Sequence, residues 1–419
     1  MRITLFSIGT QGDVRPFVAL GLGLAAQGHQ VRIASGAACR ELVVRCGLEF
    51  APLTADFLEA MAKDPGVLQR GKHPLTFLRT ARQLLAEMSV SWPEQGLAAA
   101  EGQELLIGNG MVSMLAGSLA EKLGIGFLET QLQPVTPCPD IPPMVVTPKG
   151  ERPWGPMNLA LAHFYRLIVW QMLRAAIDPL RRALALPAIS WRGPYRGRDP
   201  DHYPLLYGFS PTLLPPSPHW PAGVHVAGNW FLDDADWQPP PALQAFLAAG
   251  EKPVYIGFGS MVSGTSAALT DSLLAALRRS GHRAILATGW GGLAESDGLG
   301  EQIFQLKEAP HHWLFPRVSA AIHHGGVGTT AATLRAGIPS VVIPFFGDQP
   351  FWAWRLQRLG VAPPALPATQ LDVDAIARAL ETALLPATRQ RAAALGEVVA
   401  GEQGIASAIT QMQRWGLLA

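Results

Sequence analysis

One eight-residue segment combines histidines, glycines and threonines in an order suited to binding a phosphate group. It reads His323-His324-Gly325-Gly326-Val327-Gly328-Thr329-Thr330 and joins a short apolar run to a helical pattern. At such a helix start the backbone N–H groups are free and the helix dipole is positive, so an anion is favoured there. No lysine follows the glycines, which excludes a Walker loop. The segment therefore predicts a diphosphate site; the alternative is a packing turn with two core histidines.

A second candidate is Asp13, in the turn Gly9-Thr10-Gln11-Gly12-Asp13-Val14-Arg15-Pro16 between the first predicted strand and the first predicted helix. An aspartate just before a helix that starts with proline commonly caps that helix. The same place, at the edge of a sheet, also suits a general base. From spacing alone, both roles stay open for Asp13.

Three other patterns also place glycines or polar residues near predicted helices. Asp348 and Gln349 begin one helix, where the aspartate either caps the helix or joins Gln349 in binding adjacent hydroxyls of a sugar. Ser260 follows a glycine-rich strand end and is a predicted phosphate contact. The segment Gly21-Leu22-Gly23-Leu24-Ala25-Ala26 fits the dinucleotide fingerprint but falls inside a predicted helix. We therefore attribute its small residues to close packing of the helix on the sheet.

These turns require strands and helices in alternation, and the hydrophobic pattern predicts that alternation in both halves of the chain. In the first half the predicted strands cover residues 2–8, 30–35, 48–53, 104–108 and 126–130. In the second half they cover residues 253–258, 283–288, 302–306, 320–323 and 340–344. Helical patterns separate them, which predicts an α/β fold with two doubly wound parallel sheets. Ligands should bind beyond the carboxyl ends of the strands, in a central cleft between the halves.

Proline clusters suggest where the halves join. The cluster at residues 210–223 is the predicted interdomain linker, because proline-rich segments are stiff and extended. We therefore expect a Rossmann-like domain at 1–209 and a second one at 224–400. The last predicted helix, within 401–419, is expected to cross back to the first domain.

The composition of the 419-residue chain excludes several classes of protein. Lys and Arg number 33 and Asp and Glu 32, so a net charge of +1 gives no sign of a general nucleic-acid binder. Hydrophobic residues make up 48%, which suffices for large cores and suits apolar substrates. Cys39, Cys46 and Cys138 fit neither a disulfide framework nor a zinc site. No segment resembles a signal peptide or a membrane span, so a cytoplasmic location is expected.

Taken together, the motifs show a family resemblance. The segments from Pro310 to Phe315, from His323 to Thr330 and from Pro344 to Gln349 resemble the donor box of nucleotide-sugar glycosyltransferases of the GT-B fold. The turn from Gly9 to Pro16 matches the opening G-(S/T)-x-G-D-V-x-P of the sterol 3-beta-glucosyltransferases and the antibiotic glycosyltransferases. The sequence departs from the plant donor box in two places: the opening Trp has no counterpart near residues 307–310, and Gly328 replaces an Asn.

The resemblance implies a role for each motif. It makes Asp13 the general base and Asp348 with Gln349 the sugar contacts. Diphosphate contacts follow at His324, Gly325, Gly326, Gly328, Thr329 and Ser260. Nucleoside contacts are expected at Lys307, Ala309 and His311. Acceptor contacts are expected at Gln11, Phe77, Met88, Met111, Gln131, Phe164 and Trp352.

The expected reaction is an inverting, metal-independent transfer of a hexose, glucose from UDP-glucose, to a hydroxyl of a lipophilic acceptor such as a sterol, carotenoid, polyketide or phenolic. No cofactor is expected besides this donor substrate, and the protein is expected to act as a monomer or homodimer. The alternatives are a TDP-deoxysugar-dependent antibiotic glycosyltransferase, a sugar-nucleotide 2-epimerase and a noncatalytic sugar-nucleotide-binding protein. The helix at 158–182 either presents a solvated face or touches a membrane surface.

Overall fold

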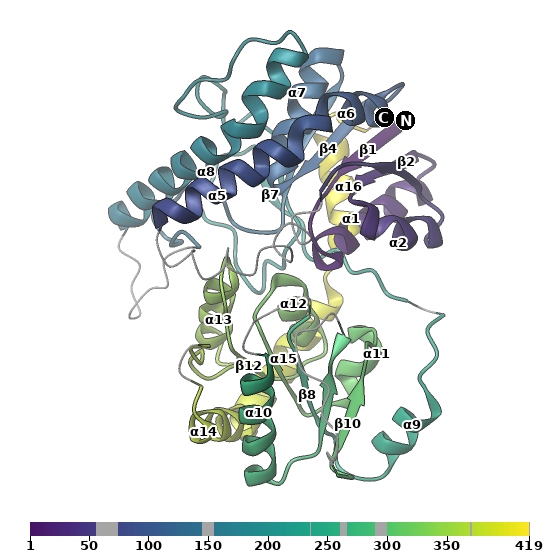
Figure 1. Ribbon diagram of the computed structural model, residues 1–419, viewed down its shortest axis with the longest axis vertical. Helices are drawn as coiled ribbons and strands as arrows, with labels where there is room; N and C mark the ends of the chain where they lie inside the picture. The colour runs from purple at the N-terminus through teal and green to yellow at the C-terminus, as the bar shows by residue number, and fades with distance from the viewer. Residues whose placement is uncertain are drawn as a thin grey trace.

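The computed structural model describes residues 1–55, 74–144, 155–234, 236–259, 266–289, 300–368 and 371–418. It consists of two α/β halves stacked along the long axis of the molecule (Figure 1). Each half is built on one parallel sheet, as the alternating pattern predicts. The expected α/β class and the two doubly wound sheets are therefore confirmed.

The sheet of the first half has seven parallel strands in the order β3-β2-β1-β4-β5-β6-β7. Its strands are β1 (Arg2–Phe6), β2 (Gln30–Ser35), β3 (Glu49–Pro52), β4 (Leu105–Asn109), β5 (Gly126–Gln131), β6 (Leu205–Tyr207) and β7 (Val224–Val226). Its helices are α1 (Gln11–Ala26), α2 (Arg40–Arg45), α5 (Pro74–Met88), α6 (Trp92–Ala100), α7 (Ser113–Leu123) and α8 (Gly155–Ala183).

Successive side chains of β1 point to opposite faces of this sheet and contribute to two separate hydrophobic cores. Ile3 and Leu5 of β1 pack with α1 and α2 on one face. Phe6 packs on the other face with α5, α6, α7 and α8. Strands covered on both faces must be apolar throughout, which explains the continuous hydrophobic runs in the sequence.

The sheet of the second half has five parallel strands in the order β10-β9-β8-β11-β12. Its strands are β8 (Val254–Gly257), β9 (Ala284–Ala287), β10 (Ile303–Leu306), β11 (Ala320–His323) and β12 (Ser340–Val342). The helices of this half are α9 (Pro241–Ala248), α10 (Ser266–Ser280), α11 (His311–Leu314), α12 (Val327–Arg335), α13 (Gln349–Arg358), α14 (Val373–Leu384) and α15 (Pro386–Gly401).

The boundary between the halves lies further along the chain than predicted. Residues 224–226 form β7, which pairs with β6 in parallel and so belongs to the first sheet. The proline-rich segment 210–223 therefore connects two neighbouring strands of the first half instead of linking the domains. The chain passes to the second half after β7, because the next strand, β8, belongs to the other sheet.

The last helix, α16 (Gly404–Arg414), returns to the first half and lies beside α1 (Figure 1). Glu402, just before α16, secures this return. Its Oε1 accepts hydrogen bonds from Ser210 Oγ at 2.6 Å and from Thr212 Oγ1 at 2.8 Å. The C-terminal segment is therefore bound to the first half by polar contacts as well as by packing.

The glycines of the segment that fits the dinucleotide fingerprint, Gly21 and Gly23, permit close packing of α1 on its neighbours. A Cβ at Gly21 would meet Leu48 and Val31 of the first half at 3.0 and 3.2 Å, as the predicted contact between helix and sheet requires. A Cβ at Gly23 would instead lie 2.3 Å from Ile405 Cγ2 of α16. Gly23 therefore permits the close approach of two helices, a contact that the sequence does not reveal.

Replacing Gly23 by alanine should destabilise the protein. Alanine favours a helix more than glycine, but its methyl group would overpack against Ile405, which costs about 1–3 kcal/mol. Thermal unfolding of Gly23→Ala should show a lowered midpoint, whereas Gly401→Ala, where a Cβ meets open space, should leave it near that of wild type. The double variant Gly23→Ala with Ile405→Ala should be more stable than expected from adding the changes in unfolding free energy of the two single variants. Strict additivity would show that the two residues do not interact.

Candidate active site

Asp13 lies in the first turn of α1, where Thr10 holds its carboxylate. Thr10 is the N-cap residue and Asp13 the third helical residue, so the two form a capping box. Oδ2 of Asp13 accepts hydrogen bonds from the Thr10 backbone N at 2.8 Å and from Thr10 Oγ1 at 3.0 Å. No described residue donates a hydrogen bond to Oδ1. One oxygen therefore fixes the side chain, and the other remains available to a ligand.

Gly9 keeps the space beside this carboxylate open. Its φ is +130°, and a Cβ there would lie 2.4 Å from Asp13 Oδ2, so only glycine fits. Burial raises the pKa of Asp13, against the opposing effect of the hydrogen bonds from Thr10. A carboxylate with a raised pKa is a stronger base than an exposed one. The cap role and the base role that spacing left open are thus compatible.

The histidine–glycine segment forms the turn between β11 and α12. Gly326 is the N-cap of α12, and no side chain caps this helix. His323 Nδ1 accepts a hydrogen bond from the backbone N of Gly325 at 3.1 Å, so this N–H is not free for a ligand. The backbone donors available to an anion are therefore those of the first turn of α12, which the helix itself leaves unbonded.

His324 stands over this turn as a neutral side chain. A Cβ at Gly326 would lie 2.4 Å from His324 Nε2, so the ring covers the N-terminus of α12. Burial lowers the pKa of His324 to about 4. Two buried atoms, His324 Nδ1 and Thr330 Oγ1, lack a hydrogen-bond partner in the described part of the chain. The turn thus offers neutral donors and a helix dipole to an anion.

Asp348 lies at the start of α13, but its side chain does not cap that helix. Oδ2 of Asp348 instead accepts a hydrogen bond from Trp352 Nε1 at 2.6 Å. The pKa of Asp348 is raised to about 6, mainly by burial; the charge of Asp13 also raises it, while Trp352 and the nearby side chain of Gln133 lower it. The carboxylate is thus held by hydrogen bonds that include those of Trp352 and Gln133, and it stands within electrostatic reach of Asp13.

Gln349, the predicted partner of Asp348, shapes the turn that carries it. Its Oε1 accepts hydrogen bonds from the backbone N of Phe345 at 2.7 Å and of Phe346 at 3.2 Å. Only 5% of the residue is exposed. The carbonyl end of this side chain is therefore occupied by the protein backbone.

The chain matches known families over both halves. Residues 3–137 match the glycosyltransferase family 28 N-terminal domain, and residues 272–404 match the C-terminal domain of the erythromycin biosynthesis protein CIII-like family. The O-mycaminosyltylonolide 6-deoxyallosyltransferase of Streptomyces fradiae is 34% identical over 420 residues, which cover 99% of this chain and 97% of that protein. The chain belongs to the GT-B glycosyltransferases.

Other relatives agree with this assignment. The sterol 3-beta-glucosyltransferase of Aspergillus clavatus is 34% identical over 99% of the chain, which spans only 30% of that longer protein. Among solved structures, the calicheamicin glycosyltransferase CalG4 superimposes with a TM-score of 0.68 at 16% identity, covering 99% of this chain and 97% of its own. The spinosyn rhamnosyltransferase SpnG with spinosyn aglycone superimposes with a TM-score of 0.65 at 18% identity, covering 99% and 100%. These structures confirm the expected GT-B fold.

The predicted nucleoside contacts of the glycosyltransferase lie just after β10. Lys307 is exposed, whereas Ala309 and His311 are half-buried. The His311 ring stacks on Phe315 with centroids 4.3 Å apart. Burial lowers the pKa of His311 to about 4, and Arg15 of the first half adds to this effect. Arg15 therefore brings a charge of the first half close to the predicted nucleoside site.

The structure separates the predicted acceptor contacts into two groups. Gln11, Met111 and Gln131 are half-buried, and Phe164 is 60% exposed on α8. Met88 and Trp352 are buried: Met88 packs in the core beside Trp92, and Trp352 donates a hydrogen bond to Asp348, so their contact with an acceptor stays a prediction. The Phe77 side chain and Ser260 lie outside the described residues.

Two residues near the site carry no recognisable sequence motif. Gln133 and Tyr165 of the first half lie close to Asp348 of the second half. His323 belongs to the histidine–glycine motif, and the structure adds its role, because it fixes the backbone of that turn.

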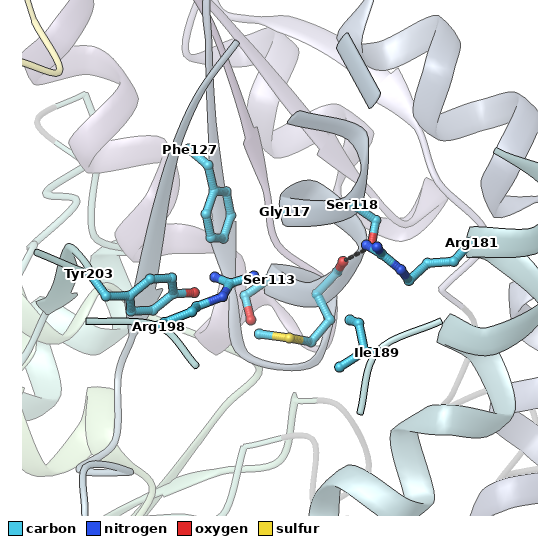
Figure 2. Close-up of a pocket in the computed structure, with 9 residues that line it drawn as sticks. Ser113, Gly117, Ser118, Phe127, Arg181, Ile189, Arg198 and Tyr203 are labelled. Carbon is cyan, nitrogen blue, oxygen red and sulfur yellow. Dashed lines mark hydrogen bonds between the residues drawn. The ribbon is translucent and has the colours of Figure 1, made fainter. Parts of the chain in front are cut away.

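Other features of the molecule lie apart from this site. Figure 2 shows a small pocket in the first half, where Phe127, Tyr203 and Arg198 face Ser113 and Arg181; it contains none of the predicted site residues. Within the described ranges, no three His, Cys, Asp or Glu side chains are grouped so that they could hold a metal ion. None of the described helices is long and apolar enough to cross a membrane.

The raised pKa of Asp348 predicts a pH-dependent stability difference for Asp348→Asn. The folded state binds this proton more tightly than the unfolded chain, so wild-type stability falls as the pH rises from about 4 to about 6. Asparagine avoids this cost and still accepts the Trp352 hydrogen bond. At pH 7.5 the variant should be more stable than wild type by at most about 3 kcal/mol, and at pH 4 the two should be equal. Urea unfolding at both pH values measures this; a pH-independent difference would contradict it.

Proposed function

We propose that this glycosyltransferase moves glucose from UDP-glucose to a hydroxyl of a lipophilic acceptor, with inversion at the anomeric carbon. The observation that carries the proposal is the meeting of two carboxylates from opposite halves, Asp13 and Asp348, since the charge of one raises the pKa of the other. The anion-binding turn at the start of α12 belongs to the same half as Asp348. This supports one reaction centre that would include the base, the sugar contact and the diphosphate site.

In the proposed reaction Asp13 Oδ1 takes the proton of the acceptor hydroxyl. The acceptor oxygen forms a bond to the anomeric carbon as the bond from that carbon to the diphosphate oxygen breaks on the opposite face. The leaving diphosphate gains negative charge. The unbonded N–H groups of α12, its dipole and the neutral His324 stabilise this charge without any metal.

The proposed donor is glucose rather than a deoxysugar. Trp352 donates a hydrogen bond to Oδ2 of Asp348 and the Gln133 side chain also hydrogen-bonds to this carboxylate, whose remaining lone pairs would accept a hydrogen bond from a sugar hydroxyl. A deoxysugar that lacks this hydroxyl would leave a desolvated carboxylate oxygen without a partner. The Streptomyces relative is a 6-deoxyallosyltransferase, which keeps a deoxysugar donor as the second candidate. The sterol 3-beta-glucosyltransferases among the relatives support glucose and a sterol-like acceptor.

The donor proposal predicts a ranking of specificity constants. We expect kcat/KM to be about 10- to 100-fold higher for UDP-glucose than for a TDP-6-deoxyglucose, because a missing hydroxyl leaves a buried group unpaired. TDP-glucose, which carries the same sugar as UDP-glucose on another nucleoside, separates the effect of the nucleoside on kcat/KM from that of the sugar. In Asp348→Asn, the ratio of kcat/KM for the glucose donor to kcat/KM for the deoxyglucose donor should be closer to one. A faster rate with the deoxysugar would favour the second candidate.

The catalytic proposal predicts the behaviour of Asp13→Asn. Asparagine can still accept the hydrogen bonds of Thr10 and keep the capping box. The free energy of unfolding should therefore stay within about 1 kcal/mol of wild type. Turnover should fall by about 10²–10⁴-fold, since the general base is lost. UDP affinity should hardly change, because the nucleotide binds to the other half. All three quantities are measured on one preparation.

Three outcomes would contradict the proposal. A folded, UDP-binding and fully active Asp13→Asn enzyme would assign the base to another residue. A screen of hydroxylated sterols, carotenoids, polyketides and phenolics with UDP-glucose, read by mass, tests the reaction class. Epimerised donor without any glycosylated product would favour a 2-epimerase, and binding without turnover a noncatalytic role.

A further inference from the structure

The first turn of α1, which carries Asp13, lacks one of the hydrogen bonds of a regular helix. Pro16 lies inside α1 and has no backbone N–H, so it cannot donate to the carbonyl oxygen of Gly12 four residues earlier. Contacts from outside the regular pattern therefore matter more for the position of this turn. Thr10 supplies two of them, through its backbone N and its hydroxyl, to the Asp13 carboxylate.

Ser7 supplies a third contact, from the carboxyl end of the first sheet. It directly follows β1 and is completely buried. Its Oγ donates a hydrogen bond to the backbone carbonyl oxygen of Asp13 at 3.1 Å. Its backbone N donates to the carbonyl oxygen of Ala34 in the neighbouring strand β2, also at 3.1 Å. The backbone of Asp13 is thus connected to the sheet through one side chain.

Asn109 determines where the Ser7 hydroxyl directs its proton. Asn109 is the last residue of β4, the strand that pairs with β1, and only 9% of it is exposed. Its Nδ2 donates a hydrogen bond to Ser7 Oγ at 3.2 Å. A hydroxyl has one proton and two acceptor lone pairs, so Ser7 can accept from Asn109 and still donate to Asp13. The three residues form a chain of hydrogen bonds that ends at the backbone of Asp13.

We propose that Ser7 is a positioning residue for Asp13 and that Asn109 orients the Ser7 hydroxyl for this role. The inference rests on the proposed function, in which Asp13 takes the proton of the acceptor hydroxyl. A general base has to lie within hydrogen-bond distance of that proton, and a displacement of about 1 Å can slow a reaction about 10²-fold. In this role Ser7 touches neither the substrate nor the transferred proton. It fixes the backbone from which the Asp13 side chain extends.

Hydrogen exchange of the Thr10 amide tests the proposal without any substrate. This N–H donates to Asp13 Oδ2, so its exchange rate reports how firmly the carboxylate is held. Ser7→Ala should raise the rate about 3- to 10-fold, the effect of one net hydrogen bond. The matched control is Thr4→Val, because Thr4 is equally buried in β1 and its Oγ1 donates to the carbonyl oxygen of Ala99 at 2.8 Å. Both variants should lower the thermal midpoint to a similar extent, but Thr4→Val should leave the Thr10 exchange rate unchanged.

Turnover gives a second readout on the same variants. With UDP-glucose and an acceptor found in the screen, Ser7→Ala should lower kcat about 10- to 100-fold and leave KM for UDP-glucose unchanged. In an Asp13→Asn background the same substitution should lower kcat no further, because the residue that it positions no longer takes the proton. Asn109→Ala should lower kcat in the same direction as Ser7→Ala but to a smaller extent. Thr4→Val should keep the kcat of wild type.

Three results would overturn the positioning role and leave the proposed reaction standing. They are an unchanged Thr10 exchange rate in Ser7→Ala, equal losses of kcat in the wild-type and Asp13→Asn backgrounds, and a Ser7→Ala enzyme as active as Thr4→Val beside a slow Asp13→Asn enzyme. A fully active Asp13→Asn enzyme would refute the base of the proposed function as well. Where no acceptor is turned over, the proposed function fails, and the exchange rate alone decides whether Ser7 holds Asp13.

Discussion

The packing of α16 on α1 is the contact on which the site depends. The amino end of α1 carries Asp13, and its middle receives Ile405 at Gly23. The same α16 follows directly on the last helix of the second half, so this interface connects Asp13 with the half that carries the histidine–glycine turn. Glu402, bonded to Ser210 and Thr212, secures the point where the chain crosses. A shared core adds to this connection, because Phe209 and Leu213 pack together with Trp352 of the second half.

Desolvation shifts four titratable groups of the site toward neutrality. It raises the pKa of Asp13 and Asp348 and lowers that of His311 and His324. The two carboxylates accept hydrogen bonds from local donors, which limits the cost of burying them. A site with few permanent charges and oriented neutral donors suits a reaction in which charge moves from an acceptor proton to a leaving diphosphate.

The sequence predicts much of this arrangement because periodicity and turn chemistry are local. The alternation of strands and helices and the glycine-rich turn before α12 follow from such signals, whereas the return of the last helix, which the structure confirms, has no local signal. The predicted linker at 210–223 is wrong because β7 has only three residues, too few for a recognisable pattern. Residue type alone does not separate cores from binding sites, and both Met88 and Trp352 are buried. Tyr165 and Gln133 carry no motif of their own, and only the tertiary fold brings them to Asp348.

The hydroxyl of Tyr207 ties the segment after β5 to the first sheet. It accepts hydrogen bonds from the backbone N of Val135 and of Thr136. The following residues are anchored as well, because Cys138, Ile141 and Met144 lie in the same buried core as Tyr207. Any redesign of residues 137–144 would therefore have to keep these three apolar side chains, and the positions between them are the ones open to variation.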